Sequence, residues 1–138
     1  METPASMFNF EKLEVWQESL AFADLIYALT KNFPTTERFG LTNQMRRAAV
    51  SISSNIAEGS SRSSRVDFAR FVEIATGSIF EVTSQAALAR RLGLLADADF
   101  NRVYEDASKL GRMLSGLRRS LLDVAARGHQ PSTPIHHP

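Results

Sequence analysis

Apolar residues recur at every third or fourth position between residues 100 and 124, and this spacing restricts the fold more than any other feature of the chain. The series consists of Phe100, Val103, Ala107, Leu110, Leu114, Leu117, Leu121 and Val124. At about 100° per residue, such positions fall on one face of an α-helix. The chain therefore contains a long amphipathic helix whose apolar stripe must pack against other elements.

Three further segments show helical spacing, and clusters of helix-breaking residues separate them. The breaks fall at Phe33–Thr36, which includes a proline, at Glu58–Ser61, and between Gly93 and Asp97. We predict helices over about residues 11–33, 41–58, 64–92 and 98–126. Short connections place successive helices antiparallel, so the predicted fold is an all-α, up-down four-helix bundle.

Several residues mark where these helices begin, end or pack. Ser64 and Asp67 form a variant of the capping box at the start of the third helix, and Gly93 ends that helix. Gly59 is placed to end the second helix in a left-handed conformation. Gly77 lies inside the third helix, where it suggests the close approach of another backbone.

The composition indicates a single globular domain. With 138 residues, 43% of them hydrophobic, the chain is long enough to bury a core. We assign residues 1–127 to the bundle and residues 128–138, rich in proline and histidine, to a disordered tail. The sequence contains no cysteine and no apolar run long enough to span a membrane. We expect a cytoplasmic protein without disulfides or a membrane partner.

Histidines are absent from the predicted helices, and this restricts the chemistry that a helical bundle could perform. His129, His136 and His137 all lie in the predicted tail. Di-iron bundle enzymes need Glu-x-x-His pairs on facing helices, and the serines here have no neighbouring base. No glycine-rich phosphate loop is present. We therefore expect no catalytic residue, no metal site and no cofactor.

Arginine dominates the basic residues, although the net charge is only +1. Arg46 and Arg47 project away from the apolar seam of the second helix. Arg62 and Arg65 lie in the adjoining turn and helix start. We hypothesise that these four side chains converge into a patch that binds the phosphates of nucleic acid.

The alternative is that the basic side chains form ordinary ion pairs on solvated helix faces. Oppositely charged residues four positions apart occur three times in the fourth helix, as Arg102 with Asp106, Glu105 with Lys109, and Arg119 with Asp123.

Polar residues in the apolar seams also have two interpretations, one with a ligand and one without. Asn55, Ser78 and Gln85 either contact a ligand or hydrogen-bond one another and fix the register of the helices.

The first helix carries two apolar stripes, which together cover close to half of its circumference. One stripe consists of Leu13, Trp16, Leu20, Ala23 and Tyr27. The other consists of Val15, Phe22, Ile26, Leu29 and Phe33. A single seam of a bundle needs a narrower apolar face.

Three sequence elements carry a resemblance to a known family. Residues 40–59 read GLTNQMRRAAVSISSNIAEG, residues 68–78 read FARFVEIATGS, and Phe10-x-x-Leu13-x-Val15-Trp16 precedes them. These elements closely resemble the four-helix-bundle proteins encoded in intervening sequences of bacterial 23S ribosomal RNA genes. The resemblance covers roughly residues 8–122.

The resemblance implies a homopentameric, barrel-like ring, similar to the accessory variability protein of diversity-generating retroelements. That protein binds nucleic acid and a reverse transcriptase. A ring would account for the wide apolar arc of the first helix, so we expect Val15, Phe22, Ile26 and Leu29 at the oligomer interface. The matching Gln44, Arg46 and Arg47 element is a candidate for nucleic-acid contact.

Two functional hypotheses follow from these observations. In the first, the ring gathers weak arginine patches into a multivalent surface that binds RNA or DNA. In the second, the chain is a structural or protein-interaction bundle that binds no nucleic acid, and its arginines serve interfaces and solubility. Neither hypothesis involves catalysis.

Overall fold

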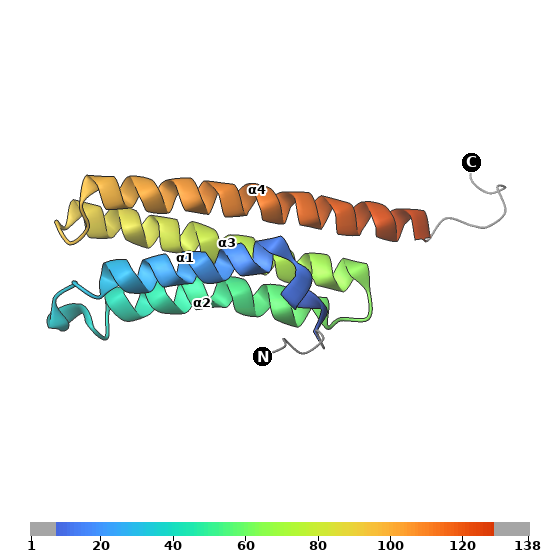
Figure 1. Ribbon diagram of the computed structural model, residues 1–138, viewed down its shortest axis with the longest axis horizontal. Coiled ribbons are helices and arrows are strands. Elements are labelled where there is room, and N and C mark those ends of the chain that lie inside the picture. Colours follow the sequence, from blue (N-terminus) through green and yellow to red (C-terminus); the bar gives the residue numbers. More distant parts are fainter. Residues whose placement is uncertain (1–7, 129–138) are drawn as a thin grey trace, which may run out of the picture.

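The computed structural model describes residues 8–128, and these residues contain four α-helices. The α-helices are α1 (Glu14–Thr30), α2 (Leu41–Ser60), α3 (Arg65–Arg91) and α4 (Asp97–Gly128), as shown in Figure 1. One-turn 3₁₀-helices precede α1 (Asn9–Lys12) and α2 (Thr35–Glu37). The predicted all-α fold is therefore confirmed. Residues 129–138 of the predicted tail lie outside the described residues, whereas Gly128 still belongs to α4.

Each helix packs against two neighbours, so that the four form a closed square in cross-section. The helix α1 contacts α2 and α4, and α3 also contacts α2 and α4. The backbones of diagonal helices lie farther apart than those of neighbouring helices. Successive helices run in opposite directions (Figure 1). The α1/α2 pair and the α3/α4 pair consequently form opposite sides of the bundle.

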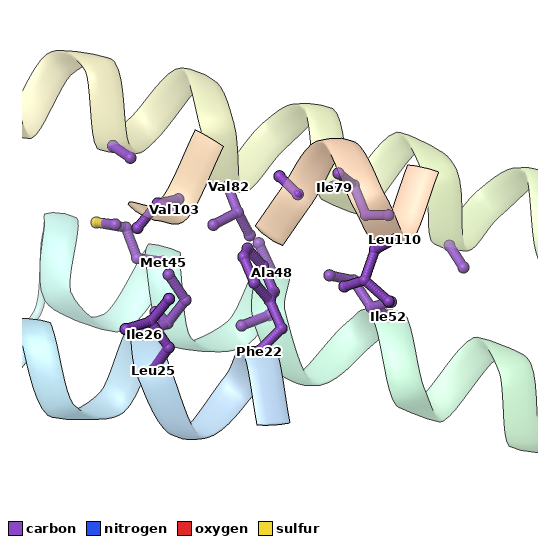
Figure 2. Packing of buried hydrophobic residues seen from close by; sticks show 14 of the residues in the cluster. Phe22, Leu25, Ile26, Met45, Ala48, Ile52, Ile79, Val82, Val103 and Leu110 are labelled. Carbon is purple, nitrogen blue, oxygen red and sulfur yellow. The ribbon is translucent and has the colours of Figure 1, made fainter. Parts of the chain in front are cut away.

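The core fills the space between the four helices. Side chains from all four meet there in the close-up of Figure 2, including Ile26, Met45, Val82 and Val103. These four residues are fully buried. Their burial is the main stabilising term for such a fold, because removing apolar surface from water contributes about 25 cal/mol per Å². None of the described helices is long and apolar enough to cross a membrane.

The helix α1 is three residues shorter at each end than predicted. At its start, Leu13 adopts an extended conformation, which separates α1 from the preceding 3₁₀ turn. At its end, Pro34 follows Phe33, and a proline disfavours helical conformation in the residue before it. The chain leaves the helix after Thr30, and the side chain of Phe33 nevertheless remains buried in the core.

Both ends of α3 form as the sequence predicts. The Ser64 hydroxyl accepts a hydrogen bond from the amide of Asp67 at 3.0 Å. At the other end, Gly93 has a φ of +78°. The amide of Leu94 donates to the carbonyl of Ala89, and the Gly93 amide donates to the Arg90 carbonyl, which together make a Schellman motif.

Two glycines have roles that differ from those predicted. Gly59 does not end α2, because the helix continues to Ser60. It allows α3 to approach instead: a Cβ at this position would lie 2.7 Å from the Cβ of Phe71 and 2.8 Å from a ring carbon of Phe68. The close approach predicted at Gly77 is absent, since a Cβ there would meet no atom within 4 Å.

Candidate interaction surfaces

Arg46 joins α2 to the end of α1. Its Nε donates a hydrogen bond to the Thr30 hydroxyl at 2.8 Å, and Nη2 donates to the Tyr27 carbonyl at 3.3 Å. The guanidinium also lies 4.5 Å from the centre of the Tyr27 ring. Its donors and its planar face therefore serve packing between helices within the chain.

Arg62 has a similar role in the turn between α2 and α3. It forms an ion pair with Glu58 at 2.7 Å and stacks 4.6 Å from the centre of the Phe71 ring. Arg46 lies in the second turn of α2, whereas Arg62 follows its last residue, so roughly 20 Å of helix separates them. Arg47 lies next to Arg46 in α2, and Arg65 is the first residue of α3, close to Arg62 in sequence. Both side chains are exposed. The four predicted arginines thus form two separate pairs and not one patch.

The three ion pairs expected along α4 are absent from the described residues. Lys109 reaches across to Glu18 of α1 at 3.4 Å, and Arg118 reaches Glu73 of α3 at 3.2 Å. Arg112 and Arg119 are exposed and form no salt bridge in this part of the chain. Ion pairs therefore link α4 to its neighbours and leave arginines free on its outer side.

The stripe of α1 that was expected at an oligomer interface faces the chain's own core. Val15 is 6% exposed, Phe22 2% and Ile26 0%. Leu29 is partly buried and packs against the same cluster. These side chains are covered within one chain, so their apolar character needs no oligomer to explain it. Periodicity identified both stripes, but the stripe assigned to the interface is the one that the core buries.

Only part of the other stripe of α1 lies on the outside of the bundle, because Leu13, Trp16 and Ala23 are half-buried and pack against the core. Leu20 is 40% exposed and Tyr27 44% exposed, and the exposed Asp24 lies between them. These three residues, which we name the outer stripe of α1, are spaced by four and three positions and so share one helix face. Next to Tyr27, a groove of about 620 Å³ runs between α1 and α2 past Arg46 and Val50.

A larger groove of about 730 Å³ lies between α3 and α4, on the other side of the bundle. We name it the α3/α4 groove. Small side chains such as Ala87, Ser108 and Gly111 line it, and two aromatic residues, Phe80 and Tyr104, stand at its edges. Phe80 is 72% exposed and Tyr104 55% exposed. Large aromatic side chains in an open apolar groove are typical of sites where another molecule binds.

Arginines surround the α3/α4 groove. Arg112 belongs to its lining. At one end, the guanidinium of Arg90 lies 3.9 Å from the centre of the Phe100 ring, which also lines the groove. The Arg118–Glu73 ion pair joins the two helices near the other end. These three arginines and one glutamate give the rim of the groove a net positive charge.

Sequence periodicity does not reveal this groove, because it identifies residues that share the apolar face of each helix. Phe80 and Tyr104 each lie beside a buried residue, Ile79 and Val103, and point away from the core. A usable signal was present: large aromatic residues on the otherwise polar side of two adjacent helices. Their meeting in one groove depends on how α3 and α4 pair, which periodicity does not determine.

The polar residues of the α2/α3 seam bond with one another. The Ser78 hydroxyl donates to the Ser51 hydroxyl at 2.9 Å. Asn55 donates to the Ser51 hydroxyl and carbonyl at 3.0 and 2.8 Å. This network fixes the register between α2 and α3. Of the two interpretations of these polar residues, hydrogen bonding among themselves therefore describes Asn55 and Ser78, and no ligand is needed to explain them. Gln85 differs: its Nε2 lies 3.4 Å from Glu81, and its buried Oε1 accepts no hydrogen bond from the described residues.

No cluster of three metal-binding side chains occurs among residues 8–128. His129, His136 and His137 lie outside the described residues. Within the described part, the concave surfaces hold hydroxyl, amide, carboxylate and guanidinium groups without a neighbouring imidazole or thiol. Their chemistry suits recognition by packing, hydrogen bonding and charge.

The chain is similar to two sets of known proteins. The model of a family described as 23S rRNA-intervening sequence protein matches residues 11–116. A similar crystal structure is that of a protein of unknown function from the S23 ribosomal protein family of Bacteroides thetaiotaomicron. Its TM-score is 0.68 at 25% sequence identity, over 76% of this chain and 98% of that one. No curated protein matches the chain.

Proposed function

The chain belongs to the 23S rRNA-intervening sequence protein family, and from this premise we propose that it acts without catalysis, as a helical bundle that assembles with copies of itself. The observation that carries this proposal is the α3/α4 groove, with Phe80 and Tyr104 exposed at its edges. Exposed apolar surfaces of this kind favour association, because covering them removes apolar area from water.

The outer stripe of α1 gives the proposal a second support. A monomeric helix in this position needs only one apolar face, toward its own core. Leu20 and Tyr27 add apolar surface on another face, where nothing in the described chain covers them fully. The resemblance to the accessory variability protein suggests a ring of five copies, and five remains the proposed number.

Substitution of a groove residue tests this function. Phe80→Asp places a charge on an exposed edge of the groove, so the fold should persist while association is lost. Sedimentation velocity should show a wild-type particle several times the 15.3 kDa chain mass and a Phe80→Asp particle near the chain mass. Circular dichroism should show equal helicity in both. A wild-type chain that sediments as a monomer at high concentration refutes self-assembly.

Nucleic-acid binding is a second candidate function, and free arginines favour it. Arg47, Arg65, Arg112 and Arg119 are exposed and form no salt bridge among the described residues. A ring would present several copies of each, so that weak phosphate contacts add up. Binding of a structured ribosomal RNA fragment should then fall steeply between about 50 and 200 mM salt. Absence of binding at the lower salt concentration rejects this second function.

A further inference from the structure

Helix-in-groove recognition combines a groove that lets a helix approach closely with a helix whose apolar anchors share one face, as residues seven positions apart do. Both parts are present in this chain. Ser108 and Gly111 make the α4 wall of the α3/α4 groove low, which lets another helix approach closely. The outer stripe of α1 has anchors seven positions apart, Leu20 and Tyr27, roughly 10 Å along the helix axis.

These two surfaces cannot meet within one chain. The helix α1 packs against α2 and α4 but not against α3, so the α3/α4 groove opens on another side of the bundle. Figure 1 shows the same arrangement, with α1 and α2 together on one side. The outer stripe of α1 can therefore enter the α3/α4 groove only from a second molecule.

Charges distinguish between the possible pairings of these surfaces. Two grooves that face each other would bring Arg90 and Arg112 of one copy, which form no salt bridge in the described chain, close to the same arginines of the other. Two outer stripes that face each other would oppose Asp24 to Asp24. Like charges across an interface oppose binding, whereas a stripe that lies in a groove brings Asp24 near Arg112. Asp24 forms no salt bridge within the described chain.

We infer that the α3/α4 groove of one copy receives the outer stripe of α1 from a second copy, in a head-to-tail interface. This inference rests on the proposed self-assembly and specifies its geometry. Each chain has one donor surface and one acceptor surface, so an open assembly keeps a free donor surface at one end and a free acceptor surface at the other. Such heterologous contacts produce closed rings or open filaments, unlike the two-fold contact of a simple dimer.

A block-and-mix experiment tests the pairing directly. Leu20→Asp disables the outer stripe and leaves the groove intact, whereas Phe80→Asp disables the groove and leaves the stripe intact. Each variant alone should have a mass near 15.3 kDa by light scattering. An equal mixture should form a complex of two chains, because the intact groove of one variant accepts the intact stripe of the other. Ser120→Asp, on an exposed position of α4 that belongs to neither surface, should retain the wild-type mass.

The possible outcomes separate the inference from the function on which it rests. A monomeric wild type overturns both. If the wild type assembles but Leu20→Asp assembles equally well, self-assembly stands and the head-to-tail interface is wrong. If both variants are monomeric and their mixture stays monomeric, the groove does not accept the stripe and the inference fails, whereas self-assembly of the wild type stands.

A charge exchange provides a test that leaves the apolar surfaces unchanged. Asp24→Arg and Arg112→Asp should each weaken assembly by about tenfold or more, because each brings like charges together across the interface. The variant that carries both substitutions again has opposite charges at these two positions, with their signs exchanged, and its dissociation constant should return toward the wild-type value. A double variant that assembles no better than either single variant contradicts the proposed contact.

Discussion

Gly59 shows how one small residue determines the packing of two helices. It is buried in the last turn of α2, and Phe68 and Phe71 of α3 lie where its side chain would be. Its sequence position, next to a predicted turn, suggested a helix end. That prediction failed because a sequence records the identity of a residue but not the backbone distance to the neighbouring helix.

Substitution of Gly59 should therefore reduce stability, despite the better helix propensity of alanine. We expect Gly59→Ala to lower the free energy of unfolding by about 1–3 kcal/mol, because the new methyl group overlaps the Phe71 Cβ. Urea denaturation measures this change. Gly77→Ala is the matched control in α3: its methyl group meets open space, so stability should rise by up to about 1 kcal/mol. Equal effects at the two positions would show that packing at Gly59 is unimportant.

At the scale of elements, periodicity and capping residues predicted the helices well. The bounds of α2, α3 and α4 lie within about two residues of those expected, since Ser64, Gly93 and the proline-containing break act locally. The largest difference was in α1, where an extended Leu13 and the effect of Pro34 shorten the helix. Local signals are sufficient for such boundaries because each depends only on residues within one turn.

The start of α3 gives a prediction at this scale. Ser64→Ala removes the acceptor for the Asp67 amide and should lower the free energy of unfolding by about 1 kcal/mol. Thermal denaturation followed by circular dichroism measures it. Ser63→Ala is the control, because the Ser63 side chain is exposed and forms no hydrogen bond in the described structure. A loss at Ser63 as large as that at Ser64 would contradict the capping role.

At the scale of the whole molecule, the sequence alone did not identify the interaction surfaces. Hydropathy shows that α1 has two apolar stripes, but it does not tell which of them faces the chain's own core. The structure buries Phe22 and Ile26 and leaves Leu20 and Tyr27 partly exposed. The four arginines likewise seemed close because Arg62 and Arg65 lie in the turn and helix start that adjoin the helix of Arg46 and Arg47, but the rigid length of α2 holds the two pairs apart. Which stripe faces the core and how far apart the arginines lie both depend on how the helices pack in the folded chain.

Ile26 and Leu20 offer a direct comparison of the two stripes. Ile26→Asp buries a charge in the core and should unfold the chain, with loss of the helical circular dichroism signal. Leu20→Asp should keep that signal and its melting temperature as a monomer. If Ile26→Asp remained fully helical and only lost assembly, the stripe at Val15, Phe22 and Ile26 would be an intermolecular surface after all.

The central question is whether the wild-type chain assembles through surfaces that are exposed in a single copy. Size-exclusion chromatography with light scattering, over a range of protein concentrations, measures this most directly. We predict a stable mass that is a multiple of 15.3 kDa, with five copies as the proposed number. A mass equal to one chain at every concentration would contradict self-assembly, and the α3/α4 groove would then need a different occupant.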